Sequence, residues 1–287
     1  MKFCPLCHGE ATRVLKLGHT SVWKCNASKC GLKFADPQLN EKDLAQAYTD
    51  HYYPSNGNGG RATYENTPEE ILRQTFGKAD AEQGPLSGKS LLDFGCGVGR
   101  LCKIAREYGI RTTGIEFDPR AREVAEKAGG LDIYSSIEHL STTISAARFD
   151  WIIMWDVIEH LRQPWCELEK LSSLLRPDGL LLLTTPNVGS LRAQVLGKRW
   201  ENIVNPTHFY YFTRRSLRLA LGRAGFSEIR EWRFPVRYPH HTTLQRFLHR
   251  ALLACHLEGE LMFVAQNRTP KLAGKNRPEI PRIEELR

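Results

Sequence analysis

From Ser87 onward, short apolar runs alternate with amphipathic segments, and this alternation most strongly limits the folds open to the chain. The apolar runs have the length of buried strands, and the segments between them carry apolar residues at helical spacing. Predicted strands cover 90–94, 111–116, 131–134, 149–155, 180–185, 226–234 and 260–265, and predicted helices cover 100–108, 119–128, 163–175 and 216–224. Because strands covered on both faces read as continuous apolar runs, we predict an α/β fold with a doubly wound, seven-stranded, mostly parallel sheet.

Composition and charge narrow the class of protein. The 287 residues are 41% hydrophobic and 25% charged, a globular balance that allows a full core. No apolar run is long enough for a membrane-spanning helix, and the start lacks the pattern of a secretory signal, so we expect a soluble, cytoplasmic protein. The net charge of +8 favours anionic partners, including nucleic acid, nucleotide-linked substrates and membrane surfaces. The sequence does not predict an oligomeric state.

Half of the eight cysteines lie within the first 30 residues, in two closely spaced pairs. In a cytoplasmic chain, cysteines are expected to bind metal or to be buried rather than to form disulfides. A C-x2-C pair followed by a C-x4-C pair can place four thiolates around one tetrahedral zinc ion, and so short a segment has too little core to fold without such support. We predict a structural zinc site formed by Cys4, Cys7, Cys25 and Cys30, with His8 as an alternative ligand.

The cysteine segment is the first of four predicted parts. These are a zinc ribbon (1–37), a helical lead-in or lid (38–86), the α/β domain (87–266) and a loose basic tail (267–287). In the lead-in, a first helix is expected over 40–48, followed by a flexible loop at 55–60. A second helix should run from Thr67 to about Glu82, because Thr67 suits the N-cap and Pro68 the first helical position.

A glycine-rich loop joins the first strand of the α/β domain to its helix. It begins at Asp93 and carries Gly95, Gly97 and Gly99. Missing side chains let a ligand approach the backbone, and the start of the following helix offers N–H donors to an anionic group. In a doubly wound sheet, this crevice is where ligands bind.

A carboxylate at the tip of the next strand reinforces this prediction. Glu116 follows the second strand, where a carboxylate can bind both hydroxyls of a ribose. The alternative is that Glu116 caps the helix that starts at Pro119, although Asp118 is better placed to do so.

Together these motifs resemble those of class I S-adenosylmethionine-dependent methyltransferases, over about residues 86–234. Four stretches match the family in order: LLDFGCGVG, GIEFDP, FDWIIMWDVIEHL and LLRPDGLLLLTTPN. The G-x-G-x-G spacing also differs from the G-x-G-x-x-G of nicotinamide enzymes. The resemblance implies a Rossmann-like fold and S-adenosylmethionine as the cofactor.

The resemblance also implies roles for single residues. Asp93 would lie near the amino group of the cofactor's methionine part, and the three glycines would form a backbone cradle. Glu116 would bind the ribose hydroxyls, and Phe117 would lie beside the adenine. Many members have an acid after the third strand, where this chain has Ser136, a weaker acceptor for the adenine amino group. Asp156, after the fourth strand, is placed with these cofactor-binding residues.

Two segments carry side chains suited to a general base, which is needed only if the acceptor must lose a proton. In the first, Asp156, Glu159 and His160 share one face of a helical turn, where they would bind a divalent metal or position a base. The alternative is that Asp156 caps a helix and that the Glu–His pair is structural.

The second segment, 205–213, has His208 among aromatic residues after the fifth strand. His208 is interpreted either as a base or as a wall of the substrate pocket, packed on Tyr210 and Trp200. We take His208 and His160 as the candidate catalytic residues. The segment resembles the H-x-x-x-F-[ST] stretch of methyltransferases of sugar and polysaccharide pathways. It lacks the Tyr and Glu that sugar C-methyltransferases place before the histidine, which leaves O-methylation open.

We expect methyl transfer to a small or carrier-linked sugar, either nucleotide-linked or a polysaccharide precursor, most consistent with O-methylation. The N-terminal cysteine segment resembles the small zinc-ribbon leaders of methyltransferases of bacterial sugar and cell-surface polysaccharide pathways. The alternative is an RNA methyltransferase that binds nucleic acid with its ribbon and basic tail. A third hypothesis is a binding module that has lost activity, and the intact glycine loop argues against it.

Overall fold

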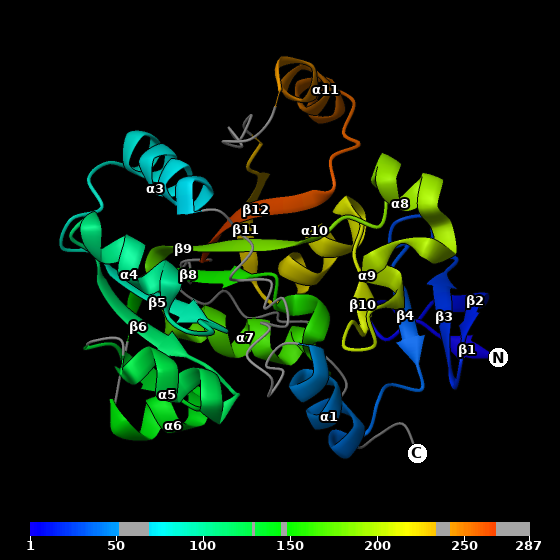
Figure 1. Cartoon of the computed structure of the whole chain (residues 1–287), viewed down its shortest axis with the longest axis horizontal. Helices are drawn as coiled ribbons and strands as arrows, with labels where there is room; N and C mark the ends of the chain where they lie inside the picture. The colour runs from blue at the N-terminus through cyan, green and yellow to red at the C-terminus, as the bar shows by residue number, and fades with distance from the viewer. Residues whose placement is uncertain (52–68, 128–129, 145–147, 234–241, 268–287) are drawn as a thin grey trace, which may run out of the picture.

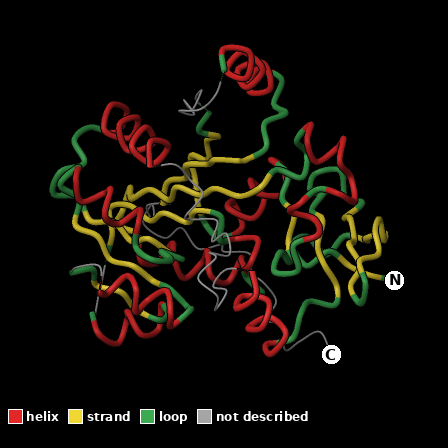
Figure 2. Tube along the Cα trace, viewed as in Figure 1, coloured by secondary structure: helices red, strands yellow, loops and turns green. Residues whose placement is uncertain are grey.

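The computed structural model describes residues 1–51, 69–127, 130–144, 148–233 and 242–267. The loop predicted at 55–60, the helix start at 67–68 and the tail beyond 267 lie outside these residues. The described residues form a large central sheet and a smaller sheet near the N-terminus (Figure 1; Figure 2).

The central sheet confirms the predicted fold class. Its order is β11-β12-β9-β8-β5-β6-β7, and β12 alone runs opposite to the other six strands. The strands are β5 (Ser90–Phe94), β6 (Arg111–Ile115), β7 (Asp132–Tyr134), β8 (Phe149–Trp155), β9 (Leu175–Pro186), β11 (Phe226–Glu231) and β12 (Glu260–Asn267). Because parallel strands end at the same edge of a sheet, the loops after β5, β6, β8 and β9 lie along one edge.

Helices cover both faces of this sheet. They are α3 (Glu69–Gln83), α4 (Arg100–Glu107), α5 (Pro119–Lys127), α6 (Ile137–Thr143), α7 (Pro164–Leu174) and α10 (Arg214–Arg223), with α1 (Glu41–His51) in the lead-in. Neighbouring residues of β5 face opposite cores: Leu91 packs in the cluster of α3 and α4, and Leu92 in that of α6, α7 and α10. Burial on both faces explains the continuous apolar runs of the sequence.

The smaller sheet joins the N-terminal segment to the α/β domain. Its order is β1 (Lys2–Phe3), β2 (Glu10–Leu17), β3 (Thr20–Cys25), β4 (Lys33–Asp36) and β10 (Tyr210–Tyr211). The edge strand β10 comes from the segment that follows β9, and Tyr210 pairs with Phe34. Buried residues of the N-terminal segment, such as Leu32, belong to the same core cluster as Leu217 of α10. The ribbon and the α/β domain therefore share both a sheet and a core.

Several boundaries differ from the predicted ones. Helix α7 ends at Leu174 and β9 begins at Leu175, so the turn expected at 177–179 lies within the strand, where Asp178 has a φ of 62°. The helical turn expected around Glu159 and His160 is the 3-10 turn η1 (Ile158–His160). The elements that the sequence did not predict are β1, β4, β10, α6, α8 (Leu191–Leu196), α9 (Glu201–Val204), α11 (Thr243–Ala254) and the 3-10 turn η2 (Gly197–Arg199). Most are too short to repeat an apolar spacing, so tertiary contacts decide them. None of the helices described is long and apolar enough to cross a bilayer.

Candidate active site and cysteine cluster

The loop after β5 depends on its glycines. Gly95, Gly97 and Gly99 have φ values of 84°, 53° and 77°, in the left-handed region that favours glycine. The N–H of Gly95 donates to the Ile115 carbonyl at 2.7 Å, which ties the loop to β6. The turn therefore presents backbone without side chains at the start of α4.

Glu116 bridges this loop and the turn after β6. Its Oε2 accepts the N–H of Gly97 and its Oε1 accepts the N–H of Asp118, each at 2.8 Å. Burial raises the pKa of the Glu116 carboxyl, although these donors oppose the shift. Asp118 accepts the N–H of Arg120 at 2.8 Å, so it takes the capping position that was the alternative for Glu116. Each Glu116 oxygen keeps a second lone pair for a hydroxyl donor.

Asp93 lies near the end of β5 and is 0% exposed. Its Oδ2 accepts a weak bond from the Cys102 thiol at 3.6 Å, whereas its Oδ1 has no hydrogen-bond partner. Burial raises the pKa of Asp93 to about 7, and the charge of Glu116 adds to the increase. A buried acceptor without a partner is costly, and an ammonium group placed at the glycine loop would satisfy it.

Phe117 and Ser136 follow the next two strands. Phe117 is 85% exposed, so its ring is accessible for stacking. The Ser136 Oγ accepts the N–H of His139 at 3.1 Å and caps α6, a role that the sequence did not predict. The hydrogen bond to adenine predicted for Ser136 would use this same oxygen.

Two threonines of β9 hold the carboxyl groups that follow β8. Thr184 Oγ1 donates to Asp156 Oδ1 at 3.0 Å, and Thr185 Oγ1 donates to Glu159 Oε2 at 2.9 Å. Burial raises the pKa of Asp156 to about 6; it also raises that of Glu159, as does the charge of Asp156. The Oε1 of buried Glu159 has no hydrogen-bond partner. Sequence reasoning missed these threonines, and their only signal was a polar pair in a leucine-rich strand.

The two candidate histidines meet, although they come from different loops. The rings of His160 and His208 lie edge to face, with centroids 4.5 Å apart. His160 Nδ1 is 3.1 Å from the Thr207 carbonyl; because a carbonyl only accepts, Nδ1 carries the hydrogen and Nε2 the lone pair. Burial lowers the pKa of His160 to about 4 and also lowers that of His208. Both rings are therefore neutral at pH 7.

Glu159, His160 and His208 each offer a ligand atom, and these atoms lie within 4.8 Å of one another. Two neutral imidazoles and a carboxylate form a donor set that suits a divalent transition metal. The sequence pattern had grouped Asp156 with Glu159 and His160. The structure brings His208 into this set, because the loop after β9 folds back over η1.

Backbone hydrogen bonds fix the His208 loop between η1 and the ribbon. The N–H of Phe209 donates to the Glu159 carbonyl at 2.8 Å. The N–H of Ala35, in β4, donates to the Phe209 carbonyl at 2.8 Å. The residue after His208 thus links the candidate site to the N-terminal sheet.

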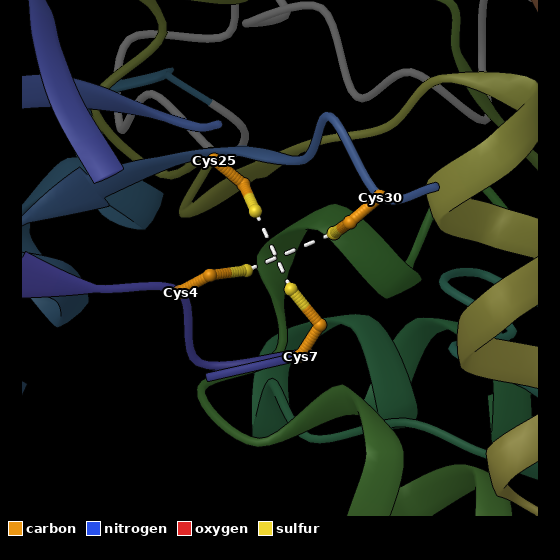
Figure 3. Close-up of side chains that lie close together, drawn as sticks. All are labelled: Cys4, Cys7, Cys25 and Cys30. Carbon is orange, nitrogen blue, oxygen red and sulfur yellow. Dashed lines mark hydrogen bonds between the residues drawn. The ribbon is translucent and has the colours of Figure 1, made fainter. Parts of the chain in front are cut away.

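Figure 3 shows the side chains of Cys4, Cys7, Cys25 and Cys30 pointing toward one another. Their sulfurs lie within 4.8 Å of one another, with 3.8 Å between Cys4 and Cys30 and 3.3 Å between Cys7 and Cys25. A tetrahedral zinc ion with Zn–S bonds of about 2.3 Å sets its sulfurs about 3.8 Å apart. The four thiols therefore fit zinc, and His8 is outside the converging group.

Comparison with known families identifies the domain. The family model described as "Methyltransferase domain" matches residues 67–231, more than half of the chain. The chain therefore belongs to the methyltransferase domain family.

Curated relatives match over part of their length. A ubiquinone biosynthesis O-methyltransferase of Haemophilus ducreyi is 32% identical over 130 residues, which cover 42% of this chain and 55% of the relative. The mitochondrial ubiquinone biosynthesis O-methyltransferase of Schizosaccharomyces pombe is 33% identical over 110 residues, which cover 36% of this chain and 40% of the relative. The chain thus spans about half the length of the curated relatives it matches.

Solved structures share the fold. The 1,6-didemethyltoxoflavin-N1-methyltransferase of Burkholderia thailandensis superposes with a TM-score of 0.53 at 17% identity, covering 91% of this chain and 100% of that one. A SAM-dependent methyltransferase of Thermotoga maritima gives a TM-score of 0.52 at 15% identity, covering 78% of this chain and 100% of that one. At these identities the likeness supports the Rossmann-like fold alone.

Proposed function

We propose that the protein methylates a hydroxyl group of a small or carrier-linked acceptor. The observation that carries this proposal is the buried pair of neutral histidines, His160 and His208, at the sheet edge that also holds the glycine loop. A hydroxyl must lose its proton as it attacks a methyl group, and a neutral imidazole can take that proton.

The glycine loop and its neighbours form the proposed donor site. S-adenosylmethionine, when bound, supplies an electrophilic methyl group. Asp93 accepts a hydrogen bond from the ammonium of its methionine part, and Glu116 accepts from the ribose hydroxyls. Phe117 stacks on the adenine, and the adenine amino group donates a hydrogen bond to Ser136. Asp156 is the remaining residue assigned to the donor site. The unpartnered Oδ1 of Asp93 supports this placement.

The histidine pair is the proposed base. With a methyl donor bound, His208 or Nε2 of His160 would take the proton that the acceptor hydroxyl loses as its oxygen is methylated. The ligand oxygen of Glu159 lies within 4.8 Å of a nitrogen of each ring, and in its ionised form this carboxyl group would stabilise the imidazolium that forms. Holding the acceptor in line and excluding water supplies much of the remaining rate enhancement.

Two acceptor classes are proposed for the test. The sequence predicts a nucleotide-linked or carrier-linked sugar. The relatives named above are ubiquinone biosynthesis O-methyltransferases, which supports oxygen as the methylated atom and adds ubiquinone precursors as the second class. The cysteine cluster, with four ligands and no open position, is proposed to hold a structural zinc ion.

The experiment is turnover with a labelled methyl donor against nucleotide sugars, lipid-linked sugars and prenylated phenols. With the best acceptor, His208→Ala should lower kcat by about 10²- to 10⁴-fold, the usual contribution of a general base. Donor affinity should not change, because the donor contacts lie on other loops. His19→Ala, at an exposed turn of the ribbon, is the matched control. Unchanged turnover of His208→Ala would refute the proposed base.

A further inference from the structure

Helix α11 (Thr243–Ala254) joins β11 to β12, and Figure 1 shows it standing clear of the central sheet. None of its residues is buried. A capping box starts it: the Thr242 Oγ1 accepts the N–H of Gln245, and the Gln245 Oε1 accepts the N–H of Thr242. A helix of this length is marginal in water without a packed face. We therefore expect α11 to pack against a binding partner.

The apolar side chains of α11 gather on one face, directed to solvent. Leu244, Phe247 and Leu248 are 66%, 67% and 50% exposed. Their spacing of three and four residues places them side by side along the helix. Exposed apolar groups that cluster in this way mark an interaction surface, whereas single ones need no explanation.

The charges of α11 have one sign. It carries Arg246 and Arg250 and no acidic residue, and neither arginine forms an ion pair within the described residues. The arginines lie toward the side of the helix away from the apolar stripe, and this separation of apolar and basic side chains is the pattern of a helix that lies in the headgroup layer of a membrane. The whole chain, with a net charge of +8, is also positively charged.

The position of α11 ties this surface to the candidate site. It enters β12 at Glu260, which pairs with Pro186 at the end of β9. The N–H of Asn187, next along the chain, donates to the Gly259 carbonyl at 2.9 Å. Helix α11 thus arises at the sheet edge where the loops of Asp93, His160 and His208 lie.

We propose that α11 docks the protein on an anionic lipid bilayer, with Leu244, Phe247 and Leu248 among the acyl chains and Arg246 and Arg250 at the headgroups. This brings the site-bearing edge to the membrane surface. The placement of the site at the membrane rests on the proposed function, because it suits an acceptor carried by a lipid or an apolar tail. The docking of α11 does not depend on the proposed function.

A second copy of the chain fits this face less well. Symmetric pairing through the stripe would bring together two copies that each carry a net charge of +8, and α11 has no acidic side chain to pair with the arginines of the other copy. Anionic headgroups instead neutralise the arginines, and no desolvated like charges remain.

The test is co-sedimentation of the full-length protein with vesicles of phosphatidylcholine alone or mixed with phosphatidylglycerol, without methyl donor or acceptor. The protein should bind the mixed vesicles. The triple variant Leu244→Ser/Phe247→Ser/Leu248→Ser should lose about tenfold or more in partition coefficient, and Arg246→Gln/Arg250→Gln should lose the preference for phosphatidylglycerol. Val124→Ser, exposed on α5 beside the opposite edge strand, is the matched control and should bind normally.

Three outcomes would overturn the docking proposal: no binding of the unmodified protein, equal binding of the triple variant, or a dimer that the triple variant converts to monomer. Circular dichroism should show that the variants are folded, because the substituted apolar side chains are at least half exposed. Because no turnover is measured, failure of this test leaves the proposed methylation unaffected.

Discussion

Asp93 shows how burial prepares one side chain for a charged ligand. It is 0% exposed, one of its oxygens has no partner, and its pKa is raised to about 7 by burial and by Glu116. Its carboxyl group is therefore partly protonated at neutral pH when no donor is bound. Only the ionised form pairs fully with an ammonium group.

The affinity for S-adenosylmethionine should therefore depend on pH. Below the pKa of Asp93, binding must first remove its proton, so affinity should fall about tenfold per pH unit, mainly between pH 7 and pH 5. Calorimetric titration across this range tests the expectation, and Asp93→Asn should bind weakly with a flat pH profile. Cys102 and Glu116 also face Asp93. The variant Glu116→Gln removes the negative charge of Glu116, so it shows how much that charge contributes to the pH dependence. A flat profile of the unmodified protein would contradict the role of Asp93.

The sequence predicted the positions of some single residues of the candidate site but not of others. The glycines and Glu116 could be predicted because local spacing fixes their positions at the ends of neighbouring strands. The contact between His160 and His208 could not, because it depends on how the loop after β9 folds over η1. Ser136 was assigned to a ligand, yet its oxygen caps α6, a helix that the sequence did not predict.

Among the elements, β10 connects the cysteine cluster to the candidate site. Tyr211 and Tyr210 pair with β4 of the ribbon, and the preceding Phe209 bonds to both Ala35 and Glu159. The ribbon thus positions the loop of His208. A two-residue strand has no signature of its own, and only its distant partner defines it.

Loss of the metal should therefore impair turnover as well as stability. Cys4→Ser should release zinc and destabilise residues 1–37, and through β10 it should lower kcat while donor affinity persists. Metal analysis, urea unfolding and calorimetry measure the three effects. Cys166→Ser, on α7 and not among the four converging thiols, is the control and should keep its zinc. An unchanged metal content in Cys4→Ser would rule out the site.

Strand and helix predictions succeeded where apolar runs are long. Strands β5 and β8 match their predicted ranges because both of their faces are buried. The boundary between α7 and β9 failed because Leu175 to Gly179 continues as strand despite its turn-forming residues. Helix α11 was not predicted, although the spacing of Leu244, Phe247 and Leu248 is that of an amphipathic helix.

At the scale of the whole molecule, the functional features converge on one edge of the central sheet. The glycine loop, the carboxyl groups after β8 and the His208 loop all follow the ends of parallel strands, and α11 arises beside them. The sequence predicted the order of strands and helices along the chain well enough to place this edge. It did not predict the shared sheet of ribbon and domain, because that pairing joins residues far apart in the chain.

The central claim is that the loop after β5 seats S-adenosylmethionine, and calorimetric titration of the donor tests it most directly. The unmodified protein should bind, and Gly97→Arg should not, because its side chain fills the cradle at a φ of 53°. Thermal unfolding checks that the variant is folded, and Glu116→Ala, which keeps the glycine, should bind more weakly. Equal affinity of Gly97→Arg and the unmodified protein, or no binding by the folded unmodified protein, would contradict the account.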